Sequence, residues 1–345
     1  MANKHLPHDL AQMQSLPLEA KIIMTKQRIR QWYEYWDGQV YVGFSGGIDS
    51  TVLKHIVDSM YDDVPALFVN TGLEYPEIQQ FVKDIKAGKY ECFNPDVEIV
   101  RPKLRFDEVL KKYGYPVVSK SVSHAVKIAK RNPDGNVMKN YFTPENTGRF
   151  GFFKWKFLID AEFETSEECC NVMKKAPAKL YTKQTGRKPM LGTRADESSL
   201  RYSKWLKYGC NAFAGDAPIS QPLSFWTHQD ILHYIKRYDV PYCSVYGDIQ
   251  TASKDGQLSL SDCLNEYDEA DKLMTTGCDR TGCIFCMFGC HLEKEPNRFQ
   301  RLKETHPKQY KYCIGGGELI DGKWQPSKEG LGLGKVLDYI GVKYE

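Results

Sequence analysis

The sequence predicts an α/β fold, with a doubly wound and mostly parallel sheet followed by a cysteine-rich C-terminal appendage. Short apolar runs alternate with longer, more polar stretches over residues 40–113, which is typical of parallel strands joined by crossover helices. A glycine-rich turn stands between the first apolar run and the stretch that follows it. Farther along, residues 242–317 hold seven of the eleven cysteines and few long apolar runs, which indicates a different kind of region.

Apolar spacing predicts the individual elements. Within residues 17–36, Leu18, Ile22, Ile29 and Trp36 recur at spacings of four and seven, which predicts a helix. Short apolar runs predict buried strands at 40–44 and 66–69 and further strands at 97–100 and 189–192. Amphipathic stretches predict helices at 51–60, 75–86, 106–113 and 119–131.

The remaining elements are shorter. Thr227 and Asp230 form a capping-box-like pair that predicts a helix start, and a proline ends this helix before residue 242. Residues 318–324 surround an Asp-Gly turn and predict a hairpin, and 336–340 predict a last helix. Residues 132–165 show no clear period. We expect three parts: an N-terminal helical segment at 1–38, a nucleotide-binding domain at 39–241, and a cysteine-rich region and tail at 242–345.

Composition and charge favour a cytoplasmic protein with no membrane partner. No apolar run reaches the ~20 residues that a membrane helix needs, and residues 1–17 lack the apolar core of a secretory signal. The net charge of +3 is too small to indicate nucleic acid binding by itself. In a reducing compartment, clustered cysteines indicate metal binding or redox chemistry rather than disulfides.

Residues 45–50, with the sequence Ser-Gly-Gly-Ile-Asp-Ser, are predicted to bind phosphate. The start of a helix offers unpaired N–H groups and a partial positive charge to an anion. Gly46 and Gly47 let the backbone approach phosphate oxygens, and Ser45 and Ser50 add hydroxyl donors. Asp49 is an anion in an anion site, which a bound Mg²⁺ would explain. The alternative is a plain strand-to-helix turn; the Gly-Lys-Ser/Thr ending of a Walker A loop is missing.

The string FSGGIDST resembles the PP-loop signature of ATP pyrophosphatases, which split ATP into AMP and pyrophosphate. Within that superfamily the chain resembles the phosphoadenosine-phosphosulfate (PAPS) reductase family, which implies an adenine-nucleotide α-hydrolase-like fold. Four further stretches carry this resemblance in the family's order, so that it covers roughly residues 20–290. They are FVNTGLEYPE at 68–77, CCNVMKKAP at 169–177, GTRADESSLR at 192–201 and QPLSFWTHQDILHYIKRYDVPY at 221–242.

The resemblance implies that ATP and Mg²⁺ are the cofactors of the loop. The residues that would hold them are Ser45, Gly46, Gly47, Asp49 and Ser50. Open α/β sheets bind ligands where strands end, and the residues after the second strand are Asn70, Thr71 and Gly72. A simple strand-ending turn is the alternative for these three.

The resemblance also implies catalytic roles for Asp49, Lys174, Arg194 and Arg201. The two guanidinium groups could clamp a phosphate or sulfate in a bidentate manner. Their alternative is ion pairing with Asp196 or Glu197, and that of Lys174 is a solvated surface side chain. Residues 174–188 contain six lysines and arginines and no acidic residue, which would suit either a nucleic-acid-facing patch or an ordinary solvated charge run.

Four cysteines, Cys278, Cys283, Cys286 and Cys290, lie within thirteen residues. Thiolates so close together repel one another unless a cation neutralises them, which indicates a metal site. Structural zinc sites usually use two separated ligand pairs, whereas a compact run with one Cys-x-x-Cys suits a 4Fe-4S cluster better. We expect Cys92, Cys210, Cys243 and Cys263 to be ordinary buried cysteines.

The resemblance offers a second ligand set. The iron–sulfur adenosine-phosphosulfate (APS) reductases of the family use an adjacent cysteine pair and a Cys-x-x-Cys. The matching residues here are Cys169, Cys170, Cys283 and Cys286. The sulfurtransferase of DNA phosphorothioation, another relative, uses a local run of four cysteines. We favour the local run and keep Cys169 and Cys170 as alternative ligands or as a sulfur-carrying thiol.

Two enzymatic functions compete, and the favoured one is an ATP-dependent sulfurtransferase that adenylates a substrate and inserts sulfur. The alternative is a PAPS or APS reductase that releases sulfite. The reductases use a cysteine near the C-terminus in a Glu-Cys-Gly-Leu-His-like string, which is absent: the tail ends GVKYE, and Cys313 sits in YKYCIGGG. A non-catalytic nucleotide or iron–sulfur module is a third reading. The partners expected are a small-molecule nucleotide, a nucleic-acid acceptor and a sulfur donor such as a cysteine desulfurase.

Overall fold

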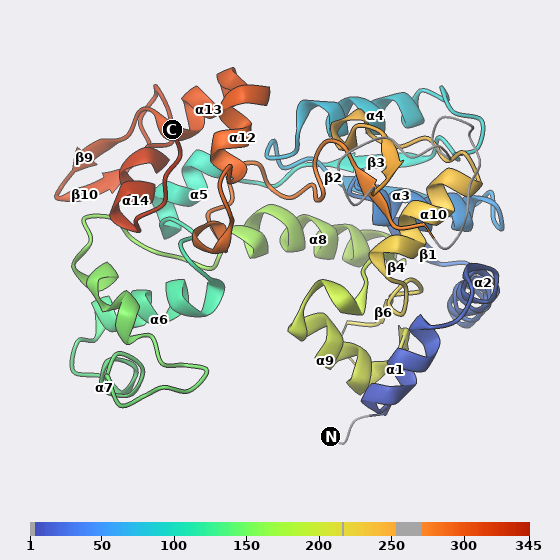
Figure 1. Ribbon diagram of the computed structural model, residues 1–345, viewed down its shortest axis with the longest axis horizontal. Coiled ribbons are helices and arrows are strands. Elements are labelled where there is room, and N and C mark those ends of the chain that lie inside the picture. Colours follow the sequence, from blue (N-terminus) through green and yellow to red (C-terminus); the bar gives the residue numbers. More distant parts are fainter. Residues whose placement is uncertain (1–3, 216, 253–270) are drawn as a thin grey trace. The chain divides into compact units, whose positions relative to one another are not determined.

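The computed structural model describes residues 4–215, 217–252 and 271–345, and Figure 1 shows its elements. Contacts between residues divide the chain into two compact units. Unit 1 contains residues 1–70, 74–100 and 178–281, and unit 2 contains residues 71–73, 101–177 and 282–345. This grouping differs from the expected division at residue 241, because residues 101–177 group with the C-terminal segment. Cys263 lies outside the described residues.

Unit 1 is built on a six-stranded sheet with the order β3-β2-β1-β4-β6-β5. All neighbouring strands are parallel except the β5–β6 pair, which confirms the predicted mostly parallel α/β fold. The chain winds outward from β1 in both directions, as in a doubly wound sheet. The strands are β1 (Val40–Gly43), β2 (Ala66–Val69), β3 (Val97–Val100), β4 (Lys188–Leu191), β5 (Asn211–Ala212) and β6 (Ile219–Ser220).

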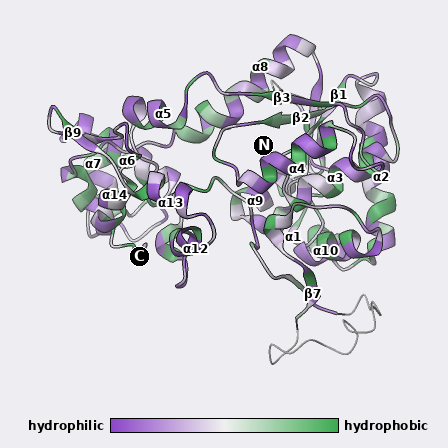
Figure 2. Cartoon of the chain, turned by 90° about the horizontal axis from the view of Figure 1, so that it is seen from above, coloured by the Kyte–Doolittle hydropathy of each residue, from purple (hydrophilic) through white to green (hydrophobic). Residues whose placement is uncertain are grey.

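Apolar clusters cover both faces of the sheet, and successive side chains of β1 alternate between the two clusters. Val40 and Val42 of β1 belong to the main apolar core, whereas Tyr41 packs on the other face with Tyr181. The helices of this unit mix hydrophobic and hydrophilic residues, as Figure 2 shows. They are α1 (Pro7–Gln14), α2 (Leu18–Tyr35), α3 (Ile48–Asp58), α4 (Pro76–Lys86), α9 (Ser199–Tyr208) and α10 (His228–Arg237), with α8 (Ala176–Thr185) beginning at the unit boundary.

A buried ion pair fixes α10 against α2. The Lys21 ammonium lies 2.8 Å from the Asp230 carboxylate, and both side chains are almost fully buried. Asp230 also closes the capping box at the start of α10, where it accepts a hydrogen bond from the Thr227 N–H at 2.6 Å. The predicted capping pair is therefore confirmed, and it does more than cap, because the same carboxylate compensates a buried cation.

Unit 1 ends in a small antiparallel pair, β7 (Ile249–Thr251) with β8 (Leu273–Thr275). Short 3₁₀ turns at Ala195–Glu197 and Ser244–Tyr246 complete it. Among the described residues, no helix combines the length and the apolar character that a bilayer crossing requires.

Unit 2 is mostly helical. Its helices are α5 (Phe106–Tyr113), α6 (Lys120–Arg131), α7 (Asn136–Tyr141), α12 (Arg298–Thr305), α13 (Pro307–Ile314) and α14 (Leu333–Tyr339), with a 3₁₀ segment at Phe153–Asp160, a π-helical turn at Asn171–Lys175 and a 3₁₀ turn at Cys290–Leu292. The predicted hairpin is confirmed as β9 (Glu318–Ile320) and β10 (Lys323–Gln325). The segment without a clear period, residues 132–165, contains only α7 and the 3₁₀ segment, and neither provides a long helical face.

Candidate functional sites: a phosphate loop and a group of four thiols

The loop between β1 and α3 is folded around its own hydroxyl groups. Gly46 has a φ of +73°, and a Cβ there would lie 2.8 Å from Ile78 Cγ2, so glycine is required. Ser50 Oγ accepts a hydrogen bond from the Ser45 N–H at 3.1 Å and donates one to the Gly47 carbonyl at 2.8 Å. The two serines therefore hold the loop against the first turn of α3.

Tyr246 completes the start of α3. Its hydroxyl accepts a hydrogen bond from the Ile48 N–H at 3.2 Å and lies 2.7 Å from Thr281 Oγ1. A Cβ on Gly47 would come within about 3 Å of both hydroxyls, so this glycine also permits a close approach. Burial raises the pKa of Tyr246 to about 12, which keeps the phenol a neutral hydrogen-bonding group. No motif in the sequence indicated this residue, because it lies 198 positions beyond its partner.

Asp49 and Arg194 are joined directly. The Arg194 Nε donates to Asp49 Oδ1 at 2.5 Å, and its NH1 donates to the Asp196 carboxylate at 2.9 Å. The exposed fraction of the Arg194 side chain is only 7%, against 24% for Asp49. Burial raises the pKa of Asp49, and the positive charge of Arg194 opposes that rise. The loop thus presents a partly buried carboxylate that a cation stabilises.

Arg201 takes part in a second ion pair. It pairs with Glu197, whose carboxylate also lies 3.0 Å from Arg280 and accepts the Arg194 backbone N–H at 2.9 Å. Both predicted arginines therefore have carboxylate partners, as the alternative interpretation expected. Their role in holding an anionic substrate stays a prediction.

Gly192, which follows β4, lies against the backbone of the loop helix. A Cβ at this position would come within 2.6 Å of the Asp49 carbonyl oxygen, and backbone atoms cannot move aside easily. Overpacking of this kind typically costs about 1–3 kcal/mol.

Gly192→Ala should therefore lower the thermal midpoint of unfolding by several degrees, at roughly 2–4 °C per kcal/mol for units of this size. Calorimetry or circular dichroism on heating would measure it. Gly282→Ala is the matched control, because nothing lies within 4 Å of a Cβ there. Equal midpoints for the two variants would contradict the close approach.

The three residues after β2 are divided between the two units. Asn70 belongs to unit 1, where its N–H donates to the Val100 carbonyl at 2.8 Å, and Thr71 and Gly72 belong to unit 2. Thr71 Oγ1 accepts a hydrogen bond from the Leu73 N–H at 3.1 Å, which is the geometry of a turn. The predicted nucleotide contacts of these three residues stay a prediction.

In unit 2, four thiols line one small cavity. They are Cys169, Cys170, Cys283 and Cys286, the pair and the Cys-x-x-Cys of the alternative ligand set. The Cys169 thiol lies 4.0 Å from the Cys170 sulfur. The hydrogen bond from Cys169 lowers the pKa of Cys170 to about 5, aided by the charges of Lys120 and Lys174 and opposed by burial. Lys174 also lines the cavity, so the predicted lysine lies beside the predicted cysteine pair.

The other two cysteines of the favoured set do not line this cavity. Cys290 is 1% exposed, its thiol donates to the Met287 carbonyl at 3.0 Å, and burial raises its pKa to about 12. Cys278 belongs to unit 1, whereas the remaining three cysteines of the local run belong to unit 2. Which of the two sets would hold a cluster stays a prediction.

The lining of the thiol cavity offers the kind of donor atoms that iron–sulfur clusters use. Four soft sulfur donors share it with apolar side chains such as Leu73, Phe106 and Met173, and Lys174 supplies a positive charge. Thiolates in an apolar shell with nearby cations are the usual ligands of such clusters. Within the described residues, no three His, Cys, Asp or Glu side chains form a group that could hold a metal ion.

The remaining cysteines divide into buried and exposed. Cys210 and Cys243 are buried as predicted, whereas Cys92 is exposed, so its expected burial is wrong. Cys92 lies in the turn before β3. Cys313 is fully buried in α13, and burial raises its pKa well above the usual value.

The basic stretch at 174–188 does not form one surface within either unit, because the unit boundary falls inside it. In unit 1, Arg187 donates to the Val40 carbonyl at 3.0 Å, and the Lys188 ammonium lies 5.1 Å from the Trp36 ring centre. These two residues therefore have structural partners. A nucleic-acid-facing role for the stretch stays a prediction.

Comparison with known proteins identifies relatives of the chain. An uncharacterized protein of Methanocaldococcus jannaschii is 30% identical over 131 residues, which is 36% of this chain and 30% of that protein. A phosphoadenosine 5'-phosphosulfate reductase of Vibrio campbellii is 24% identical over 105 residues, which is 30% of this chain and 39% of that protein. The chain thus spans about a third of the length of these relatives.

Three solved structures are similar at low TM-scores. The PAPS reductase of Candida auris, in a phosphate complex, gives 0.38 at 16% identity, covering 71% of this chain and 92% of that one. The FMN adenylyltransferase of Candida glabrata gives 0.37 at 11% identity, covering 69% and 64%. The U34-tRNA thiolase of Methanococcus maripaludis, with its 4Fe-4S cluster, gives 0.32 at 16% identity, covering 65% and 66%.

A family model describes most of the chain. The model of the phosphoadenosine phosphosulfate reductase domain matches residues 39–148 and 138–288, a range that includes the phosphate loop, Arg194 and the four thiols. The chain belongs to the phosphoadenosine phosphosulfate reductase domain family.

Proposed function

We propose that the chain is an ATP-dependent sulfurtransferase that adenylates an acceptor, releases pyrophosphate and AMP, and inserts sulfur. The observation that carries the proposal is the loop at the start of α3. Two glycines permit close approach there, two serines hold its shape, and a partly buried carboxylate stands in the first helical turn. A nucleotide triphosphate with its metal ion matches this combination of N–H donors and one carboxylate.

Several residues of unit 1 would each have a separate role in the first step, which is adenylation of the acceptor. The N–H groups of Gly46 and Gly47 and the Ser45 hydroxyl would bind phosphate oxygens, and Asp49 would hold Mg²⁺. Arg194, already beside Asp49, would stabilise charge on the α-phosphate. An acceptor oxygen attacks the α-phosphorus, the bond to the β-phosphate oxygen breaks, and pyrophosphate leaves.

The second step needs a sulfur nucleophile. Sulfide, which a thiol reductant would release from the persulfide of a donor such as a cysteine desulfurase with formation of a disulfide, attacks the acceptor atom, and the bond from that atom to oxygen breaks as AMP leaves with the oxygen. Cys169, Cys170, Cys283 and Cys286 would hold a 4Fe-4S cluster. When bound through three of these cysteines, with the fourth thiol released, such a cluster would supply an iron to which a sulfur ligand can coordinate. Lys120 and Lys174 would balance the negative charge of the thiolates.

Reduction of a sulfonucleotide is the second candidate, and the family favours it. Such a reaction needs an accessible cysteine that attacks sulfur. Cys313, the last cysteine of the chain, is 0% exposed and its pKa lies well above the usual range, so it is poorly suited to that role. The burial of Cys313 argues against this residue as the attacking cysteine.

A direct competition tests the two functions. One reaction contains the anaerobically purified chain with PAPS or APS and thioredoxin, and the other contains ATP, a sulfide source and nucleic acid. We expect ATP-dependent pyrophosphate and AMP in the second reaction and no sulfite in the first. Rapid sulfite release without ATP would establish the reductase instead. Absence of turnover in both, with nucleotide still bound, would support a non-catalytic module.

A further inference from the structure

Unit 2 carries an aromatic and basic segment at residues 149–157. Residues 149–157 read Arg-Phe-Gly-Phe-Phe-Lys-Trp-Lys-Phe, and no acidic residue occurs between Glu145 and Asp160. Phe150, Phe153 and Phe157 are 45%, 46% and 40% exposed. Large rings that alternate with cations on a surface are characteristic of proteins that bind single-stranded nucleic acid.

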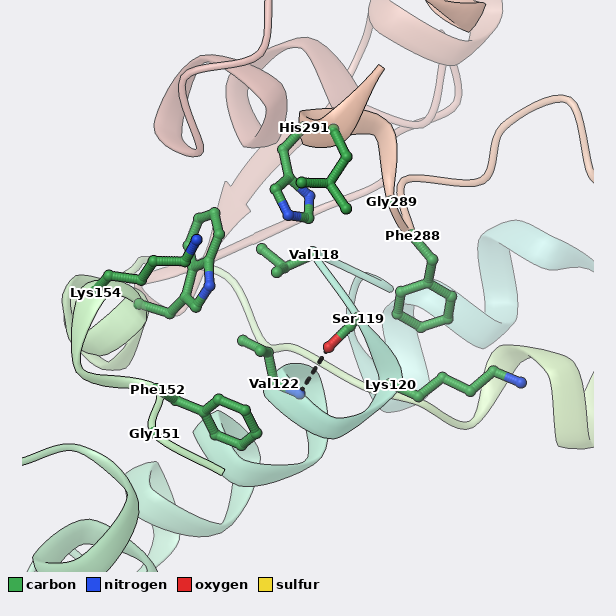
Figure 3. A pocket seen from close by; sticks show the side chains of 12 residues that line it. Val118, Ser119, Lys120, Val122, Gly151, Phe152, Lys154, Phe288, Gly289 and His291 are labelled. Atoms are coloured by element: carbon green, nitrogen blue, oxygen red, sulfur yellow. Dashed lines mark hydrogen bonds between the residues drawn. The ribbon is translucent and has the colours of Figure 1, made fainter. Parts of the chain in front are cut away.

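A cavity of about 530 Å³ lies beside this segment, entirely within unit 2. Its volume falls within the ~300–1,000 Å³ of typical ligand sites. Three stretches line it: the start of α6, the aromatic segment, and the turn after the cysteines at 288–292. Figure 3 shows the side chains that line this cavity, among them Lys120, Phe152, Phe288 and His291.

The lining combines flat rings with positive charge. The Trp155 ring lies 5.1 Å from the His291 ring at an interplanar angle of 81°, and the Lys154 ammonium lies 4.9 Å from the centre of Trp155. His291 Nδ1 is buried and makes no hydrogen bond to any residue that the structure describes. A buried polar atom of this kind costs about 1–3 kcal/mol unless a ligand or water satisfies it. A nucleotide would match this lining, because its planar base can stack on the rings and its phosphate can pair with the Lys154 ammonium.

The cavity also adjoins the thiol site. Lys120 lines the cavity, and its charge acts on the Cys170 thiol. The Gly289 N–H donates to the Val118 carbonyl at 2.8 Å. The stretch that follows Cys286 therefore contacts the stretch that precedes α6. A base held in the cavity would therefore share Lys120 with the thiol site.

We propose that the cavity and the segment 149–157 bind single-stranded nucleic acid, with one base in the cavity and neighbouring phosphates on Lys120, Lys154 and Arg149. The proposal rests on the proposed function and deepens it, because it names the class of sulfur acceptor. A membrane or a protein surface could cover the exposed rings. The rings of Trp155 and His291 with the ammonium of Lys154 suit a base and its phosphate rather than either of these.

The test is a binding titration of the full chain without ATP or sulfur donor. Fluorescence anisotropy would follow labelled strands of about 12 nucleotides, within the usual footprint of such sites. The arms are single-stranded RNA, single-stranded DNA, a duplex, an abasic strand, and anionic vesicles. We expect base-containing single strands to bind tightest, with the RNA and DNA arms showing which sugar is preferred. Affinity should fall as salt increases.

Trp155→Leu should weaken binding about tenfold or more, within the ~5–150-fold that loss of one base stack produces. Trp155→Phe should restore most of it. Lys154→Ala should weaken binding and reduce the salt slope by about one. Tyr113→Leu and Lys112→Ala are matched controls, because Lys112 lies 5.3 Å from the Tyr113 ring in the same unit and neither lines the cavity. Thermal melting would verify the fold of each variant.

The outcomes separate the proposals. Equal affinity for the abasic strand, equal effects of Trp155→Leu and Tyr113→Leu, or Trp155-dependent binding to vesicles alone would overturn nucleic acid binding. Because the titration contains no ATP, this failure leaves pyrophosphate formation untouched. Loss of pyrophosphate formation in separate assays would leave Trp155-dependent strand binding intact.

Discussion

Asp49→Asn should reduce AMP and pyrophosphate formation by about 100-fold or more. Removing one preorganised electrostatic partner of a transferring group typically costs ~10²–10³ in rate. The amide is nearly isosteric with the carboxylate and can still accept the hydrogen bond from Arg194, so the fold should persist. Quantifying pyrophosphate and AMP together, at saturating ATP and with acceptor present, measures the effect.

Asp107→Asn is the matched control for this variant. Asp107 also stands in the first turn of a helix, α5, and its carboxylate lies 2.6 Å from an arginine, Arg105. It is unrelated to the phosphate loop, so its removal should leave turnover within about twofold, as expected of a surface pair. Comparable losses in both variants, or formation of ADP in place of AMP, would refute the assigned role of Asp49.

Serine at Cys169, Cys170, Cys283 or Cys286 should abolish a 4Fe-4S cluster. Each of these thiols lines the same cavity, and an iron–sulfur cluster of this type normally needs four thiolate ligands. Iron and acid-labile sulfide measured on anaerobically purified protein, with the visible absorption spectrum, report the cluster. We expect nearly complete loss in at least the Cys283 and Cys286 variants, which are common to both ligand sets.

Cys278→Ser and Cys290→Ser decide between the sets. Neither cysteine lines the thiol cavity, and the Cys290 thiol already donates to the Met287 carbonyl at 3.0 Å, so both variants should keep full iron and sulfide. Loss of the cluster in these two variants, with retention in Cys169→Ser and Cys170→Ser, would restore the local run as the ligand set. Stoichiometric zinc without sulfide in the unmodified protein would rule out either cluster.

The fold and the loop could be predicted from the sequence because their signals are local. Each strand is a short apolar run, and Gly46, Ser50 and Asp49 are contiguous with the strand-to-helix turn that they form. The capping pair at Thr227 was recognisable for the same reason. Spacing of this kind reports which residues share a turn or a face.

Contacts between distant segments could not be predicted in this way. Sequence proximity favoured Cys278 and Cys290 as ligands, whereas the adjacent pair Cys169 and Cys170, more than a hundred positions before Cys283, lines the same cavity. Tyr246 was overlooked because nothing in its neighbourhood marks it as a partner of the loop. The resemblance to the family supplied the alternative ligand set, since a family pattern carries long-range information that periodicity does not.

The aromatic segment at 149–157 shows no period in the sequence for a structural reason. It lacks a helical period because its rings are distributed between the surface and the cavity instead of lying on one face, with Phe150 exposed and Phe152 buried. Absence of a period was therefore a sign of irregular backbone, and the composition of the segment was the useful signal.

Isotope analysis of the AMP tests the central claim most directly. The reaction would be run in ¹⁸O-labelled water with ATP, a sulfide source and single-stranded nucleic acid. Mass spectrometry would then determine the ¹⁸O content of the AMP and the pyrophosphate. Because an acceptor oxygen, not water, attacks the α-phosphorus, the account predicts AMP and pyrophosphate without solvent ¹⁸O, in equal amounts with the sulfur-containing product. Solvent ¹⁸O in AMP, or AMP formed without any sulfur incorporation, would show simple hydrolysis and contradict the account.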